Sequence, residues 1–314
     1  MPWWGWMLLG IFFLGVVPMF VIQFFVALSI YSKYLVRNDK ENWDRTPKDD
    51  DDEVIVMYER GRSDFYETSK DKKIDVSVTS CGFKLVGEYY DFGHKKTAII
   101  VAGRSEALTY SYYFAIPYKK FGFNILVIDN RSHGLSEGKI NACGLLEWPD
   151  ILEWAKLLHD DYHQEEIISH GVCIGSSTCL YALTNVDAPS YYKGMVADGM
   201  YQNFPISFVN HAYEAGHSKH FVFDFFFLIF RLRAHVNPFY GPIDCIDKLN
   251  IPILFIYSME DRYSTPDKSQ ELYEKCFAPK EIKWFEKGRH SFIRINNEDE
   301  YDEAIKDFIE KYNL

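Results

Sequence analysis

The sequence predicts an α/β fold in which a mostly parallel central sheet has helices on both faces and follows one transmembrane helix. Short apolar runs, among them residues 97–101, 124–128 and 253–257, alternate with helix-compatible segments. Strands that are apolar on both sides belong in a parallel sheet that is covered on both faces. The first 32 residues form instead one long apolar stretch, which predicts the preceding helix.

Length and composition fit one large domain with an appendage. The chain has 314 residues, of which 47% are hydrophobic and 17% aromatic, which is enough for a sizeable packed core. The net charge of −11 argues against a nucleic-acid partner, whose phosphates need a basic footprint. It also argues against docking on anionic lipid by charge, so any attachment to a membrane has to be hydrophobic.

The N-terminal stretch has the length and composition of a membrane anchor. No charged side chain occurs between Pro2 and Ser32, and the run exceeds the roughly 20 residues that cross a bilayer core. Aromatic residues stand at both ends, as in interfacial belts: Trp3, Trp4, Trp6, Tyr31 and Tyr34. A cleaved signal peptide is the alternative, but its basic n-region and small-residue cleavage site are missing. We therefore expect residues 1–32 to be a retained single-pass anchor.

The residues after the anchor indicate its orientation. Lys33, Arg37 and Lys40 flank its C-terminal side, so the positive-inside rule places the main domain on the cytoplasmic side. Six cysteines without a tight framework agree with a reducing compartment.

Residues 33–73 are expected to form a polar linker, and residues 74–314 the domain that carries the function. Within the linker, the acidic run 49–53 is expected to be solvated, and a short amphipathic helix is expected near residues 54–58. From residue 74 the pattern changes to short strands and helices. The expected elements are a hairpin at 74–79 and 84–90, a strand at 97–101, a helix at 108–120, a strand at 124–128, a helix at 144–159, a strand and helix over 167–183, strands at 194–198, 253–257 and 281–285, and a closing helix around 308–309.

One short motif points to the chemistry. Residues 171–175 read Gly-x-Cys-x-Gly with Cys173 at the centre, an apolar run before it and a helix-compatible stretch after it. Strand, sharp turn and helix form the setting of a nucleophile elbow, in which both neighbours must be small because strand and helix pass closely. No serine in this region has glycines at both required positions, so the nucleophile is predicted to be the Cys173 thiol.

Five further segments accompany this motif along the chain. They are the strand end at Ala102-Gly103, the loop Asp129-x-Arg-x-His-Gly-x-Ser-x-Gly138, residues 144–150 before a helix, the strand and turn at 252–261, and Gly288-Arg-His290. In this combination, residues 74–314 resemble the α/β-hydrolases, close to their serine aminopeptidase-like and acylglycerol-lipase-like branch. The resemblance implies the α/β-hydrolase fold with a cap insertion, and a triad of nucleophile, acid and base in that chain order.

Carried over residue by residue, the resemblance implies Cys173 as nucleophile, Asp261 as acid and His290 as base, with Glu260 as the weaker candidate for the acid. A cysteine at the elbow is similar to that of the dienelactone hydrolases, a related branch with a Cys–His–Asp set. A thiol beside an imidazole can form a thiolate–imidazolium pair, which is a competent nucleophile. The other five cysteines are expected to be buried apolar fillers.

The oxyanion hole that the resemblance implies consists of the backbone N–H groups of Arg104 and Ile174. The family commonly has a histidine where this chain has Ala102, so one scaffold hydrogen bond is expected to be lost while the backbone donors remain. His133 resembles the structural loop histidine of the family.

These residues predict a hydrolase of carboxylic esters or thioesters that forms an acyl-cysteine intermediate. Thiolates attack such bonds readily, whereas amide cleavage needs firm protonation of the leaving amine, so esters are favoured over peptides. No metal-ligand spacing or phosphate-binding glycine loop occurs, and no metal or organic cofactor is expected. Two alternatives remain open: a catalytically inactive binding or scaffolding protein with the same fold, and a peptidase-like hydrolase with an electronegative site for a substrate amine.

An insertion over about residues 200–245 is expected to form the cap. It contains the aromatic run 221–230, which is too short and interrupted to span a bilayer. We expect a cap helix that packs on the body. The alternative is an apolar acyl tunnel over Cys173 for a small, lipid-like ester substrate, with Arg231 and Arg233 near a headgroup or a substrate carboxylate.

Overall fold

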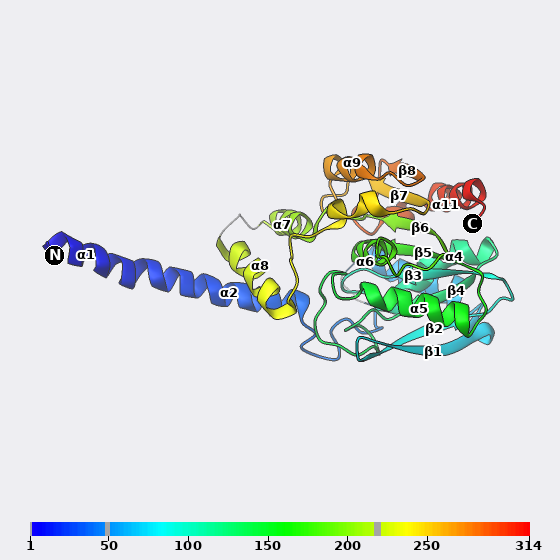
Figure 1. The fold of residues 1–314 in the computed structure, drawn as a ribbon, viewed down its shortest axis with the longest axis horizontal. Coiled ribbons are helices and arrows are strands. Elements are labelled where there is room, and N and C mark those ends of the chain that lie inside the picture. Colours follow the sequence, from blue (N-terminus) through cyan, green and yellow to red (C-terminus); the bar gives the residue numbers. More distant parts are fainter. Residues whose placement is uncertain (1, 48–50, 217–220) are drawn as a thin grey trace.

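The computed structural model describes residues 2–47, 51–216 and 221–314. Its centre is an eight-stranded sheet in the order β1-β2-β4-β3-β5-β6-β7-β8, with helices on both faces (Figure 1). The strands are parallel except at one end, where β2 is antiparallel to both β1 and β4. The mostly parallel sheet that the sequence predicts is confirmed.

Strands and helices alternate along the chain. The strands are β1 (Lys73–Ser80), β2 (Phe83–Tyr90), β3 (Lys96–Val101), β4 (Asn124–Ile128), β5 (Glu166–Val172), β6 (Tyr192–Asp198), β7 (Ile253–Ser258) and β8 (Lys280–Phe285). The helices are α1 (Trp3–Ile11), α2 (Val17–Leu35), α3 (Asp52–Arg60), α4 (Leu108–Lys120), α5 (Trp148–Asp160), α6 (Ile174–Leu183), α7 (Phe204–Glu214), α8 (Phe221–Ala234), α9 (Pro266–Lys275), α10 (Ile293–Asn296) and α11 (Glu298–Tyr312). A π-helical stretch, Phe12–Val16, joins α1 to α2.

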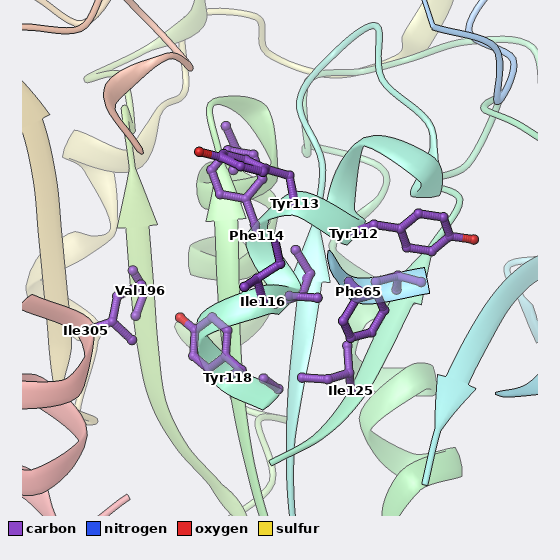
Figure 2. Close-up of a cluster of buried hydrophobic side chains, with 14 of the residues drawn as sticks. Phe65, Tyr112, Tyr113, Phe114, Ile116, Tyr118, Ile125, Val196 and Ile305 are labelled. Carbon is purple, nitrogen blue, oxygen red and sulfur yellow. The ribbon is translucent and has the colours of Figure 1, made fainter. Parts of the chain in front are cut away.

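Two buried clusters fill the space between the sheet and its helices. On one face, α4 and α11 cover the strands with an aromatic-rich cluster that includes Phe114 and Ile305 (Figure 2). On the other face, α5, α6 and α9 contribute Trp154, Leu180 and Leu272. Each such side chain stabilises the fold by roughly 1.5–3 kcal/mol when it is fully buried. The sheet is therefore a firm base for the residues at the ends of its strands.

One helix begins later than the sequence predicts. The helix expected from Gly144 begins at Trp148, because the carboxylate of Glu147 holds the preceding residues in a turn. This carboxylate accepts hydrogen bonds from the N–H groups of Ala142 (2.7 Å) and Gly144 (2.9 Å). Gly144 has a φ of +89°, and a Cβ there would lie 2.8 Å from Thr178 Oγ1, so the turn requires glycine.

One of the five cysteines expected to be buried is exposed. Four of the five expected to be buried fillers are buried: Cys143, Cys179, Cys245 and Cys276. Cys81 is exposed instead, in the tight turn between β1 and β2. That turn needs two consecutive residues with positive φ, here Cys81 (+49°) and Gly82 (+82°), and it carries both outside the core.

The N-terminal helix is long, apolar and partly free of the domain. From Trp3 to Leu35 it is long and apolar enough to cross a membrane, the one such helix among the described residues. Its large apolar side chains are mostly exposed as far as Val26, whereas Ala27 and Tyr31 are buried, as is Leu35. Figure 1 shows the free part projecting from one end of the domain. The last turns of the helix are therefore packed as part of the folded body.

The segment between α2 and β1 also lies on the domain. Arg45 forms an ion pair with the buried Asp129 (2.8 Å). The short helix expected near residues 54–58 is α3, and its Met57 and Tyr58 are buried in the aromatic cluster.

Part of the acidic run contacts the body. Asp51 caps α3 by accepting the N–H of Glu53 (3.0 Å), and both carboxylates form ion pairs with Arg289. The expectation that the run is solvated does not hold for these two residues; Asp49 and Asp50 lie outside the described residues.

The insertion expected to form the cap contains α7 and α8. Phe208 of α7 stacks on Phe226 of α8, with ring centroids 4.3 Å apart and planes 4° apart. On its other side, α8 packs along the N-terminal helix, where Phe225 meets Phe20 and Phe24 edge-on at 6.1 and 5.9 Å. The cap helix α8 thus lies between α7 and the N-terminal helix (Figure 1).

Candidate active site

Cys173 lies in the turn between β5 and α6, at the carboxyl edge of the sheet. Its φ of +55° and ψ of −116° fall outside the regions that residues with side chains normally adopt. The Cys173 N–H donates to Asp198 O (2.8 Å), which ties the turn to the end of β6. The side chain is partly exposed and lines a cavity. The turn has the geometry of a nucleophile elbow.

The two glycines of the motif are required by space. A Cβ on Gly171 would lie 2.3 Å from Ser176 N, and one on Gly175 would lie 2.1 Å from Val101 O. Neither neighbour can move away, because both are backbone atoms of the packed core. Strand, turn and helix can approach this closely only with glycine at both positions.

His290 and Asp261 meet at the same edge of the sheet. His290 Nδ1 donates to Asp261 Oδ2 (2.8 Å), and both side chains are buried. Asp261 is fixed in turn, since its Oδ1 accepts the N–H groups of Tyr263 and Ser264 at 2.8 Å each. Glu260, the weaker candidate for the acid, accepts a backbone N–H from the loop before His290 instead. The structure thus pairs His290 with Asp261.

The surroundings of His290 favour its charged form. Burial alone would lower the pKa of His290, but the Asp261 carboxylate and the nearby Cys173 outweigh burial and raise the pKa well above its usual value. The other ring nitrogen, Nε2, is buried and has no hydrogen-bond partner among the described residues. An imidazolium in this position can stabilise a thiolate and give a proton to a leaving group.

The two residues predicted to supply the oxyanion hole, Arg104 and Ile174, line the same cavity as Cys173. The backbone N–H group of Ile174 opens α6, where a helix leaves its first amides without an intrahelical acceptor. That of Arg104 follows Gly103, on which a Cβ would lie 3.6 Å from Cys173 Cβ. Over the described parts of the chain, no acceptor is paired with either N–H. That these two groups form an oxyanion hole stays a prediction.

The loop before Arg104 is held by the loop at 129–138. His133 is buried, with Nε2 against Arg104 O and Nδ1 3.0 Å from Arg131 O. Burial lowers the pKa of His133, and the contacts with the two carbonyl groups oppose this shift. Asn130 Nδ2 donates to Ala102 O (3.0 Å). Contacts from the neighbouring loop thus fix the turn at Ala102.

The sequence reasoning missed a second carboxylate beside the pair. Asp198, at the end of β6, is fully buried; its Oδ2 accepts the O–H of Tyr301 (2.6 Å), and its Oδ1 has no partner among the described residues. Burial raises the pKa of Asp198 to about 7, against the opposing hydrogen bond from Tyr301. Its position in the sequence could have pointed to it, because Asp198 ends a predicted buried strand and the ends of parallel strands meet at the sheet edge where Cys173 lies.

A cavity of about 250 Å³ adjoins these residues. Its wall includes Cys173 and His290, Arg104 and Glu106 from the neighbouring loop, and Phe208 from α7. No side chain described for α8 lines it, Arg231 and Arg233 included, so the described aromatic residues of the run, 222–230, do not form the acyl tunnel considered from the sequence. Among the described residues, no group of three or more His, Cys, Asp or Glu side chains is arranged to hold a metal ion.

Comparisons with known proteins place this chain among α/β-hydrolase structures. No protein-family model matches it. It is 26% identical to the uncharacterized protein YqkD of Bacillus subtilis (strain 168) over 283 residues, which are 85% of this chain and 89% of that protein. It is similar in structure to the Pyrococcus furiosus esterase Pf2001, with 20% identity, a TM-score of 0.67, and coverage of 79% of this chain and 94% of that one.

Two further structures share the architecture. The α/β-hydrolase GrgF from Penicillium sp. sh18 has 13% identity and a TM-score of 0.61, covering 76% of this chain and 98% of its own. The Pyrococcus horikoshii acylaminoacyl peptidase has 16% identity and a TM-score of 0.56, covering 76% of this chain and 41% of its own. The chain thus has the α/β-hydrolase fold, preceded by an N-terminal apolar helix. At these identities the likeness concerns the fold, and the reaction follows from the chemistry of the site.

Proposed function

We propose that this protein hydrolyses carboxylic esters or thioesters through an acyl-cysteine intermediate. The observation that carries the proposal is the pairing of His290 with Asp261 at 2.8 Å, which leaves Nε2 free at a cavity that Cys173 also lines. Strained backbone such as that of Cys173 persists in proteins chiefly where function requires it.

The reaction would proceed in two displacements. The Cys173 thiolate attacks the carbonyl carbon, and the carbonyl oxygen becomes an oxyanion bound by the N–H groups of Arg104 and Ile174. The bond from carbon to the leaving oxygen or sulfur then breaks, and His290 Nε2 gives its proton to the leaving group. In the second displacement, His290 takes a proton from water, the hydroxide attacks the thioester carbon, and the acid leaves as the Cys173 thiolate forms again.

The test is hydrolysis of p-nitrophenyl esters by the full chain, beside Cys173→Ala and Cys173→Ser. Turnover by the parent that is abolished by alkylation and by Cys173→Ala is the expected result. The alanine variant keeps the fold, because the smaller side chain fits the same turn. Thermal unfolding of all three proteins is the control.

Two other outcomes would contradict the proposal in different ways. Activity that appears only in Cys173→Ser would mean that the triad is competent but the thiol has silenced it. Inactivity of all three folded proteins would favour a binding or scaffolding protein that uses the same fold.

A peptidase-like activity is the second candidate, and one residue favours it. Glu106 lines the cavity, where its carboxylate accepts the O–H groups of Tyr58 (2.8 Å) and Ser105 (3.3 Å) and takes part in no ion pair found among the described residues. A carboxylate there would suit a substrate ammonium group. Turnover of aminoacyl p-nitroanilides that is lost in Glu106→Gln, while ester turnover remains, would establish this activity.

We also propose that the N-terminal helix is a retained bilayer anchor with the domain on the cytoplasmic side. The 24 residues from Trp3 to Val26 would extend about 36 Å, which is enough for the roughly 30 Å of a bilayer core. Cleavage as a signal peptide would separate the domain from Tyr31 and Leu35, which are packed into it. Lys33 and Arg37, just beyond the apolar run, support the orientation.

Attachment and orientation can be tested separately. The full chain should resist extraction from membranes by alkaline carbonate, and sealed cytoplasm-side-out vesicles should expose the domain to protease. Release by carbonate would contradict the anchor, whereas protection from protease would contradict the orientation alone.

A further inference from the structure

The end of the N-terminal helix touches the residue whose N–H is assigned to the oxyanion hole. Arg104 Nη1 donates to Tyr34 O (3.1 Å), and the guanidinium carbon lies 5.2 Å from the centre of the Tyr34 ring. The same ring meets Phe208 and His211 of α7 edge-on, at 6.0 and 6.5 Å. Arg104, Phe208 and His211 all line the cavity, so Tyr34 lies directly behind its wall.

The chain just after Tyr34 supports the same loop from a second side. Trp43 stacks on His133, with ring centroids 4.8 Å apart and planes 16° apart, and His133 in turn contacts Arg104 O. Trp43 O accepts the N–H of Gly134 (2.8 Å), and Arg37 Nη2 donates to Gly134 O (2.9 Å). Residues 34–43 therefore hold both the side chain and the carbonyl of Arg104.

We propose that Tyr34 is a positioning residue for the oxyanion hole, and that the last turn of the apolar helix belongs to the catalytic structure. The proposal rests on the function proposed above, because it assigns a role within that site. With its side chain and its carbonyl both anchored, Arg104 has little freedom to rotate, so its N–H keeps one direction. The Tyr34 ring also packs on α7, whose Phe208 and His211 line the cavity as well.

The expected effect follows from how an oxyanion hole works. Its donors stabilise charge that develops during the reaction, so a donor that turns away lowers kcat more than it changes KM. Removal of such a donor typically costs about 10²–10³ in kcat. Loosening the donor without removing it should cost less, about tenfold.

The experiment compares Tyr34→Ala, Tyr34→Phe and Arg104→Ala in the full chain, with Leu28→Ala as the matched control. Tyr34→Phe keeps the ring and the backbone carbonyl, and Arg104→Ala removes the contact with Tyr34 but keeps the backbone N–H. Like Tyr34, Leu28 packs against the buried side chains that α7 and α8 contribute, about 9 Å earlier along the helix. The first readout is kcat and KM for a short-chain p-nitrophenyl ester.

The second readout needs no turnover. Butanal adds to the Cys173 thiolate to give a thiohemiacetal, in which the carbonyl oxygen becomes an oxyanion in the proposed hole. Protection of Cys173 from iodoacetamide therefore measures the affinity for this adduct. The alkylation rate without butanal measures the reactivity of the Cys173 thiolate in the absence of the adduct.

Support would be a loss of about tenfold in kcat and in butanal affinity for Tyr34→Ala and Arg104→Ala. Tyr34→Phe and Leu28→Ala should stay near the parent, and alkylation without butanal should be unchanged in all variants. Equal losses in Leu28→Ala would reveal a merely structural effect and overturn the proposal, as would parental values for both Tyr34→Ala and Arg104→Ala. If the parent does not turn over esters but the butanal pattern holds, ester hydrolysis fails while the positioning role stands.

Discussion

Cys173 and its two glycine neighbours show how little freedom the site has at the level of single residues. The cysteine adopts a φ of +55°, and backbone conformations of this kind cost about 1–3 kcal/mol. The glycines leave no room for even a methyl group. The motif could be identified from the sequence because local steric contacts dictate the spacing of the two glycines.

Asp261→Asn should shift the alkaline limb of Cys173 reactivity to lower pH. Burial opposes the charge on His290, and Asp261 is the largest influence that raises the pKa of this histidine above 6.5. An imidazolium persists only below its pKa, so the parent keeps the positive charge on His290 to higher pH than the variant does. The measurement is the rate at which the anionic reagent iodoacetate, which a positive charge on His290 attracts, alkylates Cys173 across the range in which histidine titrates. An alkaline limb at the parental position would contradict the assigned pair.

Asp198→Asn should flatten the pH dependence of stability between about pH 4 and pH 7. The pKa of Asp198 rises from 3.8 to about 7 on folding, so its contribution to stability is fully present below pH 3.8 and is lost as the pH rises toward 7. The slope from this residue is up to about 1.4 kcal/mol per pH unit. Urea denaturation at several pH values in that range measures the free energy of unfolding of each protein, and the exposed Asp187→Asn is the control. Equal pH slopes in the parent and in Asp198→Asn would show that the pKa of Asp198 does not rise on folding.

At the scale of elements, local sequence patterns predicted most of the helices and strands. The contacts between elements far apart in the chain were the least predictable part of the structure. The buried strands and the helix at 108–120 agree closely with their expected bounds, because apolar runs and periodicity are local signals. The late start of α5 depends on the Glu147 carboxylate binding backbone amides, which no hydrophobic pattern records. The packing of α8 along α2 joins segments about 200 residues apart, so the sequence contained no local sign of it.

The docked turns of the N-terminal helix should matter more than its free part. Deleting residues 2–26 removes mostly exposed side chains, whereas deleting residues 2–35 also removes the buried Ala27, Tyr31 and Leu35. Loss of such burial costs about 2–5 kcal/mol. The longer deletion should therefore lower Tm by about 5–10 °C relative to the shorter one. Calorimetry in the same detergent tests this, and equal Tm values would show that the docked turns add no stability.

At the scale of the whole molecule, the site combines parts that differ in how far they could be predicted. Cys173, Asp261 and His290 came from motifs, and the structure brings Asp261 and His290 to 2.8 Å at one sheet edge. The wall of the cavity did not: the sequence predicted correctly that α8 packs as a cap helix, but it gave no sign that Phe208 of α7 would line the cavity. Which of two neighbouring amphipathic helices faces a cavity depends on packing across the entire cap.

The size of the cavity leads to a prediction about substrate length. About 250 Å³ lies below the roughly 300–1,000 Å³ of typical drug-sized ligand sites, so the cavity suits a short acyl group. In a p-nitrophenyl ester series, kcat/KM should be highest for acetate to hexanoate and at least about tenfold lower for laurate, since misplaced groups at such sites cost that much or more. Phe208→Ala should widen the range toward longer chains. A parent that prefers laurate would show that the cap opens beyond the described cavity.

The N-terminal helix ends inside the folded body and not in a loose tether, and this has a consequence for how the molecule would move. A protein on a flexible stalk swivels and samples all orientations above a surface. Here the end of the helix packs into the same body as the cavity, and Tyr34 lies only about 12 Å along the helix from Val26. With the helix in a bilayer, the molecule would diffuse in two dimensions with its cavity held at one height and facing one way. Encounter with substrate would then depend on how far a scissile bond rises from the surface.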